Sequence, residues 1–178
     1  AVELVKSKPD VIVTQGGPAT HTAIRAGATM PVVFGYSGDP VEAGIVASLA
    51  RPGRNFTGTT FLSFDLVGKR LELLKEVMPG LKRIAILANP QHPGEQGELR
   101  ASQAAAKALG LSFQYYQAQN AAQVEDALAA VLKSRSEAVD VFPDGLLMRS
   151  RERIAEFSTK NRIPAISGWA EFAEGGNL

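Results

Sequence analysis

The chain has 178 residues, of which 45% are hydrophobic, so it can bury one sizeable core or two small ones. Its 19 lysines and arginines against 18 acidic residues give a net charge of +1, and no basic run exceeds two residues, which excludes the electrostatic surface that nucleic-acid binding needs. No apolar stretch approaches the roughly 20 residues of a membrane span, and without cysteine the chain has neither disulfides nor thiolate metal sites.

Apolar, β-prone runs alternate along the chain with stretches of helical period. This alternation favours an α/β protein with parallel sheets. The expected strands, in chain order, are Val11–Thr14, Val32–Tyr36, Ile84–Ala88, Phe113–Gln117, Val139–Phe142 and Ala165–Ser167, with a further short β-prone segment at Phe56–Thr60.

Four helices are predicted from the spacing of apolar or small residues. The first follows a turn at Asp39-Pro40 and carries Val41, Ile45, Val46 and Leu49. The second has one apolar face made of Val67, Leu71, Leu74 and Met78. The third has a stripe of small residues at Ala101, Ala104, Ala105 and Ala108. The fourth has a face made of Val124, Ala127, Leu128, Val131 and Leu132. Asp65 is a candidate cap for the second helix, and Asn120 with Gln123 resembles a capping box before the fourth.

The segment Gly58–Phe64 is the expected boundary between two parts of the chain. If this segment is a crossover, the strand-helix units before it cannot easily share a sheet with those after Ile84. The alternative is a single doubly wound domain of about five or six strands.

Known enzyme motifs are incomplete in this chain. Gly35-Tyr36-Ser37-Gly38-Asp39 resembles a nucleophile elbow, but its second glycine comes one place early. Gly68-Lys69 lacks the upstream glycine and the following hydroxyl of a phosphate loop. The two histidines, His21 and His92, lie far apart in sequence, so no catalytic triad or metal cluster is expected. We therefore predict a protein that is not an enzyme and that holds no cofactor or metal.

Glycine-rich and polar loops follow the strands of the first part, at the edge where open parallel sheets bind small ligands. Gly16-Gly17-Pro18-Ala19 leads into a helix that contains His21, and free N–H groups there suit a carboxylate, although an ordinary tight turn would look the same. Ser37 offers a hydroxyl to a ligand. Asp39 either lies at the rim of the pocket or only caps a turn. Tyr36 either projects into the cleft or packs the loop.

Further candidates lie at later strand ends. Thr59, with Thr57 and Thr60, either contacts ligand or is a plain strand former. Asn89 follows the strand Ile84–Ala88. Asp144 either pairs with a ligand ammonium or is a solvated turn residue. Trp169, the single tryptophan, either stacks on an apolar or aromatic ligand or packs against protein.

Six segments carry a resemblance that runs nearly end to end: PDVIVTQGGPAT (9–20), PVVFGYSGDPVEAGIVASLARPG (31–53), NFTGTT (55–60), KRLELLKEVMPGLKRIAIL (69–87), VFPDG (141–145) and IPAISGWAEFAEGGNL (163–178). In this order they resemble the substrate-binding proteins of a family of bacterial ABC transporters. Those proteins have the type 1 periplasmic-binding-protein fold and include tryptophan and tyrosine binders.

The resemblance implies two Rossmann-like lobes with parallel sheets: residues 1–60 as part of lobe 1, and residues 61–178 as lobe 2 with the start of the return crossover. It implies a periplasmic or extracytoplasmic protein that captures an amino acid, aromatic ones included, or a related carboxylate. Hinge closure would hold the ligand for a permease in the membrane. Similar proteins usually carry a hydroxyl residue at the position of Gly17, so the identity of the ligand does not transfer. Similar proteins also begin and end further out, so we expect an internal fragment with an incomplete lobe 1.

Two other classes of protein stay open from the sequence. The same fold serves as the ligand-sensing effector domain of regulators and receptors, and an α/β enzyme could keep its catalytic residues outside these 178 residues. An incomplete lobe 1 would also expose sheet edges, which leaves a dimer through those edges as a further alternative.

Overall fold

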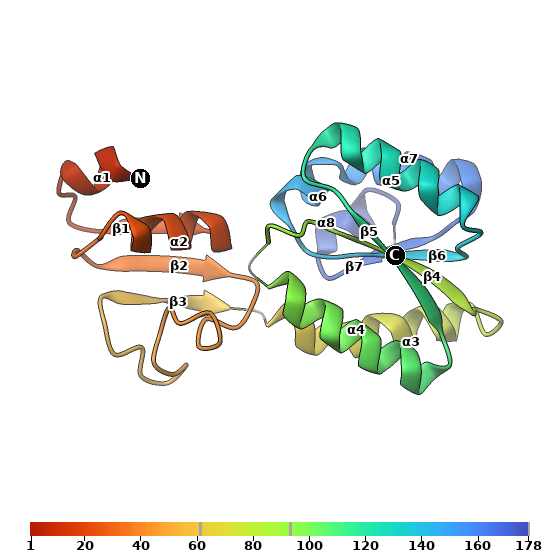
Figure 1. Cartoon of the computed structure of the whole chain (residues 1–178), viewed down its shortest axis with the longest axis horizontal. Coiled ribbons are helices and arrows are strands. Elements are labelled where there is room, and N and C mark those ends of the chain that lie inside the picture. The colour runs from red at the N-terminus through yellow and green to blue at the C-terminus, as the bar shows by residue number, and fades with distance from the viewer. Residues whose placement is uncertain (61, 93, 178) are drawn as a thin grey trace. The chain divides into compact units, whose positions relative to one another are not determined.

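The computed structural model describes residues 1–60, 62–92 and 94–177, and it divides into two compact units. Unit 1 comprises Ala1–Leu62 with His92–Gly94, and unit 2 comprises Ser63–Gln91 and Glu95–Leu178. Each unit has its own parallel sheet (Figure 1). The strands therefore do not form the single doubly wound sheet that was the alternative. The functional lobes 1–60 and 61–178 stay a prediction.

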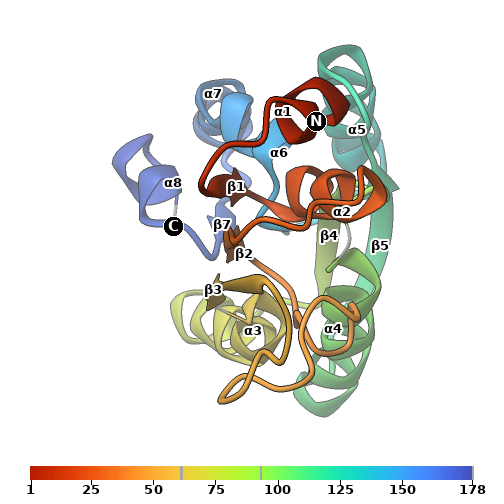
Figure 2. The ribbon, with the colours of Figure 1, turned by 90° about the vertical axis from the view of Figure 1, so that its left-hand side faces the viewer.

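Unit 1 is built on a sheet in the order β1-β2-β3. Its strands are β1 (Ile12–Gln15), β2 (Val32–Tyr36) and β3 (Phe56–Thr60), and its helices are α1 (Val2–Lys6) and α2 (Gly17–Arg25), as Figure 2 shows from the side of this unit. Alternate residues of the strands point to opposite faces, and Val32, Phe34 and Phe56 are buried on one of them. On the other face Val13 is 76% exposed and Val33 is 40% exposed. Among the described residues of unit 1, the core cluster packs on one face of this sheet.

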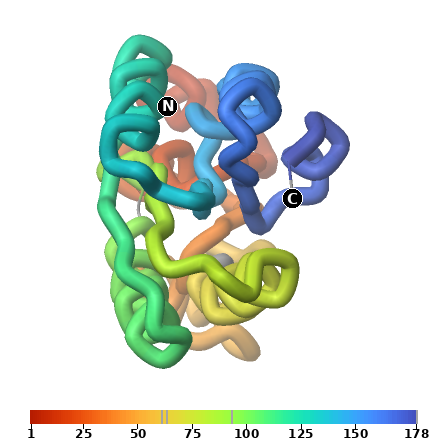
Figure 3. The backbone as a smooth tube through the Cα atoms, turned by 90° about the vertical axis from the view of Figure 1, so that its right-hand side faces the viewer, coloured from red at the N-terminus to blue at the C-terminus, as the bar shows by residue number. Residues whose placement is uncertain are grey.

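Unit 2 is a three-layer α/β unit with the strand order β5-β4-β6-β7. Its strands are β4 (Arg83–Ala88), β5 (Ser112–Gln117), β6 (Ala138–Val141) and β7 (Ala165–Ser167). Its helices are η1 (Ser63–Leu66), α3 (Val67–Val77), α4 (Glu95–Leu109), α5 (Ala121–Lys133), α6 (Gly145–Arg149), α7 (Arg151–Asn161) and α8 (Ala170–Glu174). Helices α3 and α4 cover one face of the sheet and α5 and α7 the other (Figures 1 and 3).

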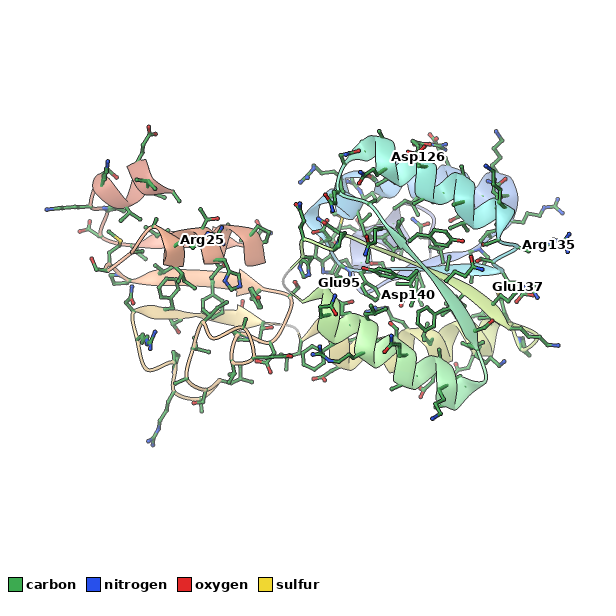
Figure 4. The ribbon with its side chains drawn as sticks, viewed as in Figure 1. Arg25, Glu95, Asp126, Arg135, Glu137 and Asp140 are labelled. Carbon is green, nitrogen blue, oxygen red and sulfur yellow. The ribbon has the colours of Figure 1, made fainter. Side chains whose placement is uncertain are left out.

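Charged side chains lie inside unit 2. Arg70 on α3 is 4% exposed, and Glu98 on α4 and Asp140 on β6 are fully buried. Arg70 Nε donates to Asp140 Oδ1 at 2.9 Å, and its Nη2 donates to Glu98 Oε2 at 3.3 Å. Glu95, which opens α4, is 2% exposed and accepts a hydrogen bond from the Tyr115 hydroxyl. Figure 4 labels Asp140 inside unit 2 and Glu95 at its edge, where α4 begins, and both side chains are buried.

The predicted strands are present, and Val32–Tyr36, Phe56–Thr60 and Ala165–Ser167 keep their predicted bounds. The apolar face predicted for the second helix is confirmed on α3, with three of its members fully buried and Met78 partly buried. The cap of α5 is also confirmed, because Asn120 Oδ1 accepts from the Gln123 backbone N–H at 3.0 Å. On α5 the prediction was wrong for Leu132, which is 44% exposed.

The helix predicted after Asp39-Pro40 is wrong, because residues 41–50 form turns. The carbonyl of Pro40 accepts the N–H groups of both Ile45 and Val46, which closes a compact turn. Gly44 has φ +68°, a left-handed conformation that interrupts an α-helix. Ile45 and Val46 are nevertheless buried in the core of unit 1. The other two members of the predicted face, Val41 and Leu49, are 38% and 57% exposed, so the apolar spacing predicted burial for only half of the face.

Three smaller predictions also need correction. The N-cap position of α3 is Leu66, the last residue of the 3-10 turn η1, and not Asp65, and it makes no side-chain cap hydrogen bond. The buried face of α4 includes Glu98, Ser102 and Ala106, whereas Ala104 and Ala108 of the predicted stripe are exposed. The predicted loop after β1 is shorter than expected, since α2 already begins at Gly17. Among the described residues, no helix combines the length and apolarity that crossing a membrane requires.

Candidate ligand-binding site

The carboxyl edge of the unit 1 sheet presents backbone donors where β1 passes into α2. Gly16 donates its N–H to the Gly35 carbonyl at 2.8 Å, which ties the end of β1 to β2. Helix α2 starts at the next residue, so Gly17, Pro18 and Ala19 form its first turn. The first N–H groups of a helix have no acceptor within the helix and carry the positive end of its dipole. Pro18 has no N–H, which leaves Gly17 and Ala19 as the donors of this turn.

Ser37 follows β2 at the same edge and is 5% exposed. Its Oγ lies 2.6 Å from Nε2 of His92, a residue 55 positions further along the chain. The backbone N–H of Gly94 in turn donates to His92 Nδ1 at 3.2 Å. The sequence analysis did not assign His92 to the site, and no local pattern points to it. The structure therefore adds His92 to the candidate site as the partner of Ser37.

Tyr36 is 3% exposed and belongs to the core of unit 1, so of its two predicted roles the structure shows packing. Its hydroxyl lies 3.3 Å from His21 Nε2, and His21 is inside α2. Burial, with Asp39 and Glu42 nearby, raises the pKa of Tyr36 to about 12. Burial and then Arg25 lower the pKa of His21 below its ordinary value. Both groups therefore stay uncharged at neutral pH.

Asp39 and Thr60 hold the loops at this edge. Asp39 Oδ1 accepts from the N–H groups of Val41 at 2.7 Å and Glu42 at 3.3 Å, so Asp39 caps a turn. Thr60 Oγ1 donates to the Gly38 carbonyl at 2.6 Å. Thr59, the neighbouring candidate, is exposed. The loop after β2 is thus held by bonds within itself and by one bond from the end of β3.

The carboxyl edge of unit 2 brings three predicted residues to the ends of neighbouring strands. Asn89 follows β4, Asp144 follows β6 and Trp169 follows β7. Asn89 Oδ1 accepts from the Gln91 backbone N–H at 3.0 Å, and Trp169 is partly buried against the core. Asp144 is 6% exposed and caps α6, where its Oδ1 accepts from Leu146 N–H at 2.7 Å. The alternative of a solvated turn aspartate is therefore wrong.

The chemistry of these groups is that of hydrogen bonding. Among the described residues, no three His, Cys, Asp or Glu side chains lie close enough to hold a metal ion. The Ser37–His92 pair also differs from an activated serine. A base must accept the hydroxyl proton, and Gly94 already donates to the other ring nitrogen of His92. The neutral ring then carries its proton on the nitrogen that faces Ser37.

Two units with parallel sheets, each with polar loops at its carboxyl edge, define a protein of the periplasmic-binding-protein fold. Over residues 1–178 the chain matches the family of ABC transporter substrate binding proteins, and it belongs to that family. This is a family of substrate-binding proteins rather than of enzymes. The predicted family and fold class are confirmed.

Three similar proteins illustrate the relationship. A tyrosine-binding protein of Clostridioides difficile is 28% identical over 168 residues, which cover 94% of this chain and 48% of the relative. The crystal structure of a conserved domain protein from Vibrio cholerae is 26% identical with a TM-score of 0.90, over 99% of this chain and 58% of that one. An ABC domain from Streptococcus pneumonia in complex with L-Trp is 22% identical with a TM-score of 0.88, and the match covers 99% of this chain and 59% of that one. The chain thus spans about half the length of the curated relative that it matches.

Proposed function

We propose that this chain is the ligand-capturing part of an ABC importer and that it binds an amino acid, aromatic ones included, or a related aromatic carboxylate. The relative is a tyrosine-binding protein, and similar structures hold L-Trp, 4-hydroxybenzoate and benzoate. These ligands share a carboxylate and an aromatic ring in one small molecule. The protein works outside the cytoplasm in this proposal and passes its ligand to a membrane permease without making or breaking a bond.

One observation carries the proposal: the carboxyl edge of unit 1 offers hydrogen-bond donors that suit a carboxylate. The first turn of α2 supplies the N–H groups of Gly17 and Ala19. The buried Ser37 follows the adjacent strand. The one acidic candidate at this edge, Asp39, already accepts two backbone N–H groups. A carboxylate can bind to this edge without displacing a bond that the protein already makes.

The remaining predicted residues complete the proposed site. Asp144 would accept from a ligand ammonium, and Trp169 would stack on an aromatic ring. Asn89 and Thr59 would lie at the rim. Ligand contacts made by both units would favour a closed form over an open one, which is hinge closure driven by differential affinity. A micromolar ligand requires about −8 kcal/mol, a magnitude that a few charge-assisted hydrogen bonds and one stacked ring can supply.

A ligand screen tests this function directly. Thermal unfolding of the 178-residue chain would be followed with L-tyrosine, L-tryptophan, 4-hydroxybenzoate and benzoate, and with a neutral sugar as the control. A ligand present at about a thousand times its dissociation constant stabilises the folded state by about 4 kcal/mol. We expect a higher melting temperature with at least one carboxylate and no change with the sugar. No change with any carboxylate, confirmed by calorimetry, would refute the proposal.

A further inference from the structure

The hydroxyl of Ser37 has a hydrogen-bonding capacity that the protein does not use. Ser37 is 5% exposed, and its Oγ contacts His92 Nε2 at 2.6 Å. Within the part of the chain that the structure describes, Ser37 Oγ has no second hydrogen-bond partner. A hydroxyl can donate one hydrogen bond and accept two. Which of these remains available depends on the direction of the bond to His92.

The backbone of Gly94 fixes that direction. Gly94 N–H donates to His92 Nδ1 at 3.2 Å, so Nδ1 is an acceptor and carries no proton. A neutral imidazole holds its single proton on one of its two nitrogens, so the proton of His92 is on Nε2. The Nε2–H group must then donate to Ser37 Oγ. Ser37 accepts from His92, and its own hydroxyl proton is left without an acceptor.

We propose that His92 is a positioning residue that makes Ser37 a hydrogen-bond donor, and that Ser37 therefore binds a carboxylate oxygen of the ligand. Leaving a buried hydroxyl proton without an acceptor is unfavourable, and a carboxylate oxygen is the strongest acceptor among the ligand groups considered above. An ammonium group could use the remaining lone pair of this oxygen, but it would leave the hydroxyl proton without an acceptor. This inference rests on the proposed function and narrows it to the ligand group that contacts Ser37.

The backbone around the pair is arranged to keep it in place. A Cβ atom added to Gly38 would lie 3.1 Å from Gly94 Cα, so two glycines allow the His92 segment to approach the loop after β2. Thr60 Oγ1 holds the Gly38 carbonyl from the end of β3 at 2.6 Å. A loop held on two sides lets a single hydrogen bond set the orientation of the Ser37 side chain.

The first test reads the protonation of His92 without any ligand. Long-range ¹H–¹⁵N NMR at neutral pH distinguishes the two neutral imidazole forms, and a His21→Gln variant assigns the signals because the chain has two histidines. We expect His92 to carry its proton on Nε2. A proton on Nδ1, or a doubly protonated ring, would overturn the inference whatever the protein binds.

The second test uses ligand pairs that differ in the carboxylate: L-tyrosine against tyramine, and benzoate against benzylamine. Calorimetry on Ser37→Ala should show an affinity for the carboxylates that is about tenfold lower or more, the effect of one hydrogen bond to a charged group. His92→Phe should lose a similar factor, whereas His92→Gln should recover most of it because its amide nitrogen can donate from a similar position. Ser48→Ala is the control, since this serine only contacts Arg51 within its own turn.

The outcomes separate this inference from the proposed function. Equal losses for a carboxylate and its amine would show that Ser37 only supports the fold, and would overturn the inference while ligand capture stands. Equal behaviour of His92→Phe and His92→Gln would remove His92 as the positioning residue. If the parent chain binds none of the four probes, the proposed function is refuted, and so is the proposal that Ser37 binds a ligand carboxylate. The NMR measurement would still show which nitrogen of His92 carries the proton.

Discussion

The ion-pair network of Arg70, Glu98 and Asp140 should dominate the stability of unit 2. The side chain of Arg70 is 5% exposed, and those of the two acids are 0% exposed. Burial alone works to lower the pKa of Arg70, but Asp140 and Glu98 together raise it above its usual value. The guanidinium thus stays charged between two carboxylates that water does not reach. Removing the cation would leave both buried carboxylates without this partner.

Arg70→Met is the informative change, since methionine fills much of the volume and removes the charge. Breaking a buried ion pair by deleting one partner costs about 3–5 kcal/mol. We expect the upper part of this range, because Arg70 serves two acids. The triple variant Arg70→Met/Glu98→Leu/Asp140→Val should regain most of the loss, since replacing a whole buried network by apolar residues is neutral or stabilising by about 1–4 kcal/mol in other proteins.

Urea unfolding followed by Trp169 fluorescence measures this effect in the unit that contains the network. The control is Arg153→Met, which breaks an exposed pair with Glu125 whose Nε–Oε1 distance is 2.6 Å and whose side chains are 46% and 48% exposed. Exposed pairs contribute about 0–1 kcal/mol, so the control should differ little from the parent. If Arg70→Met were no more destabilising than Arg153→Met, the network would not contribute to stability in the way its burial implies.

Three further predictions concern other parts of the chain. Asp144→Asn keeps the oxygen that caps α6 but removes the charge, so calorimetry should show L-tyrosine binding weakened about tenfold or more and benzoate binding not weakened; an unchanged affinity for L-tyrosine would exclude Asp144 from the site. The pKa of His21 is lower in the folded protein than in the unfolded chain, where it is about 6.5. The folded state therefore gains stability from His21 above pH 6.5 and loses it as the pH falls through the folded pKa, so the urea midpoint of His21→Gln should depend less on pH below about 6.5 than that of the parent. A midpoint that falls equally steeply with pH in both proteins would contradict this. Val13, 76% exposed on the edge strand β1, should mediate self-association, so sedimentation should show dimers that Val13→Lys abolishes; a parent chain that stays monomeric would refute it.

The elements that the sequence predicts well are those determined by local patterns. The β-prone runs became strands because alternating apolar residues pack one face of a sheet, as in β1, and continuous apolar residues pack both faces, as in β4 and β6. The cap at Asn120 was predictable because a capping box acts over three residues. The turn after Asp39 was mistaken for a helix, because the left-handed backbone of Gly44 is not visible in apolar spacing. Patterns of apolar residues therefore do not predict secondary structure where the backbone conformation of a single residue ends a helix.

The interactions that the sequence does not predict link distant parts of the chain. Arg70 and Asp140 are 70 residues apart, and Ser37 and His92 are 55 apart. In the sequence Arg70 is one of two adjacent basic residues in an otherwise amphipathic helix, and nothing local marks it as buried. His92 lies in a loop whose role in unit 1 depends on the tertiary fold. Such pairs need the fold before they can be identified.

The expectation that ligands bind at the carboxyl ends of parallel strands identified candidate residues in both units. Whether each candidate donates or accepts hydrogen bonds distinguishes the ligand group that it can bind. In unit 1 the candidate groups with remaining capacity include donors, namely the N–H groups that begin α2 and, with the inferred tautomer of His92, the hydroxyl proton of Ser37. In unit 2 the candidate with remaining capacity is an acceptor, since Asp144 uses Oδ1 for its cap and has a second carboxylate oxygen. Within the proposed function, a ligand that satisfies both units carries a carboxylate for one and an ammonium for the other. An amino acid meets that requirement, whereas benzoate would leave the buried Asp144 without its partner, and sites built around a polar group discriminate strongly against ligands that lack it.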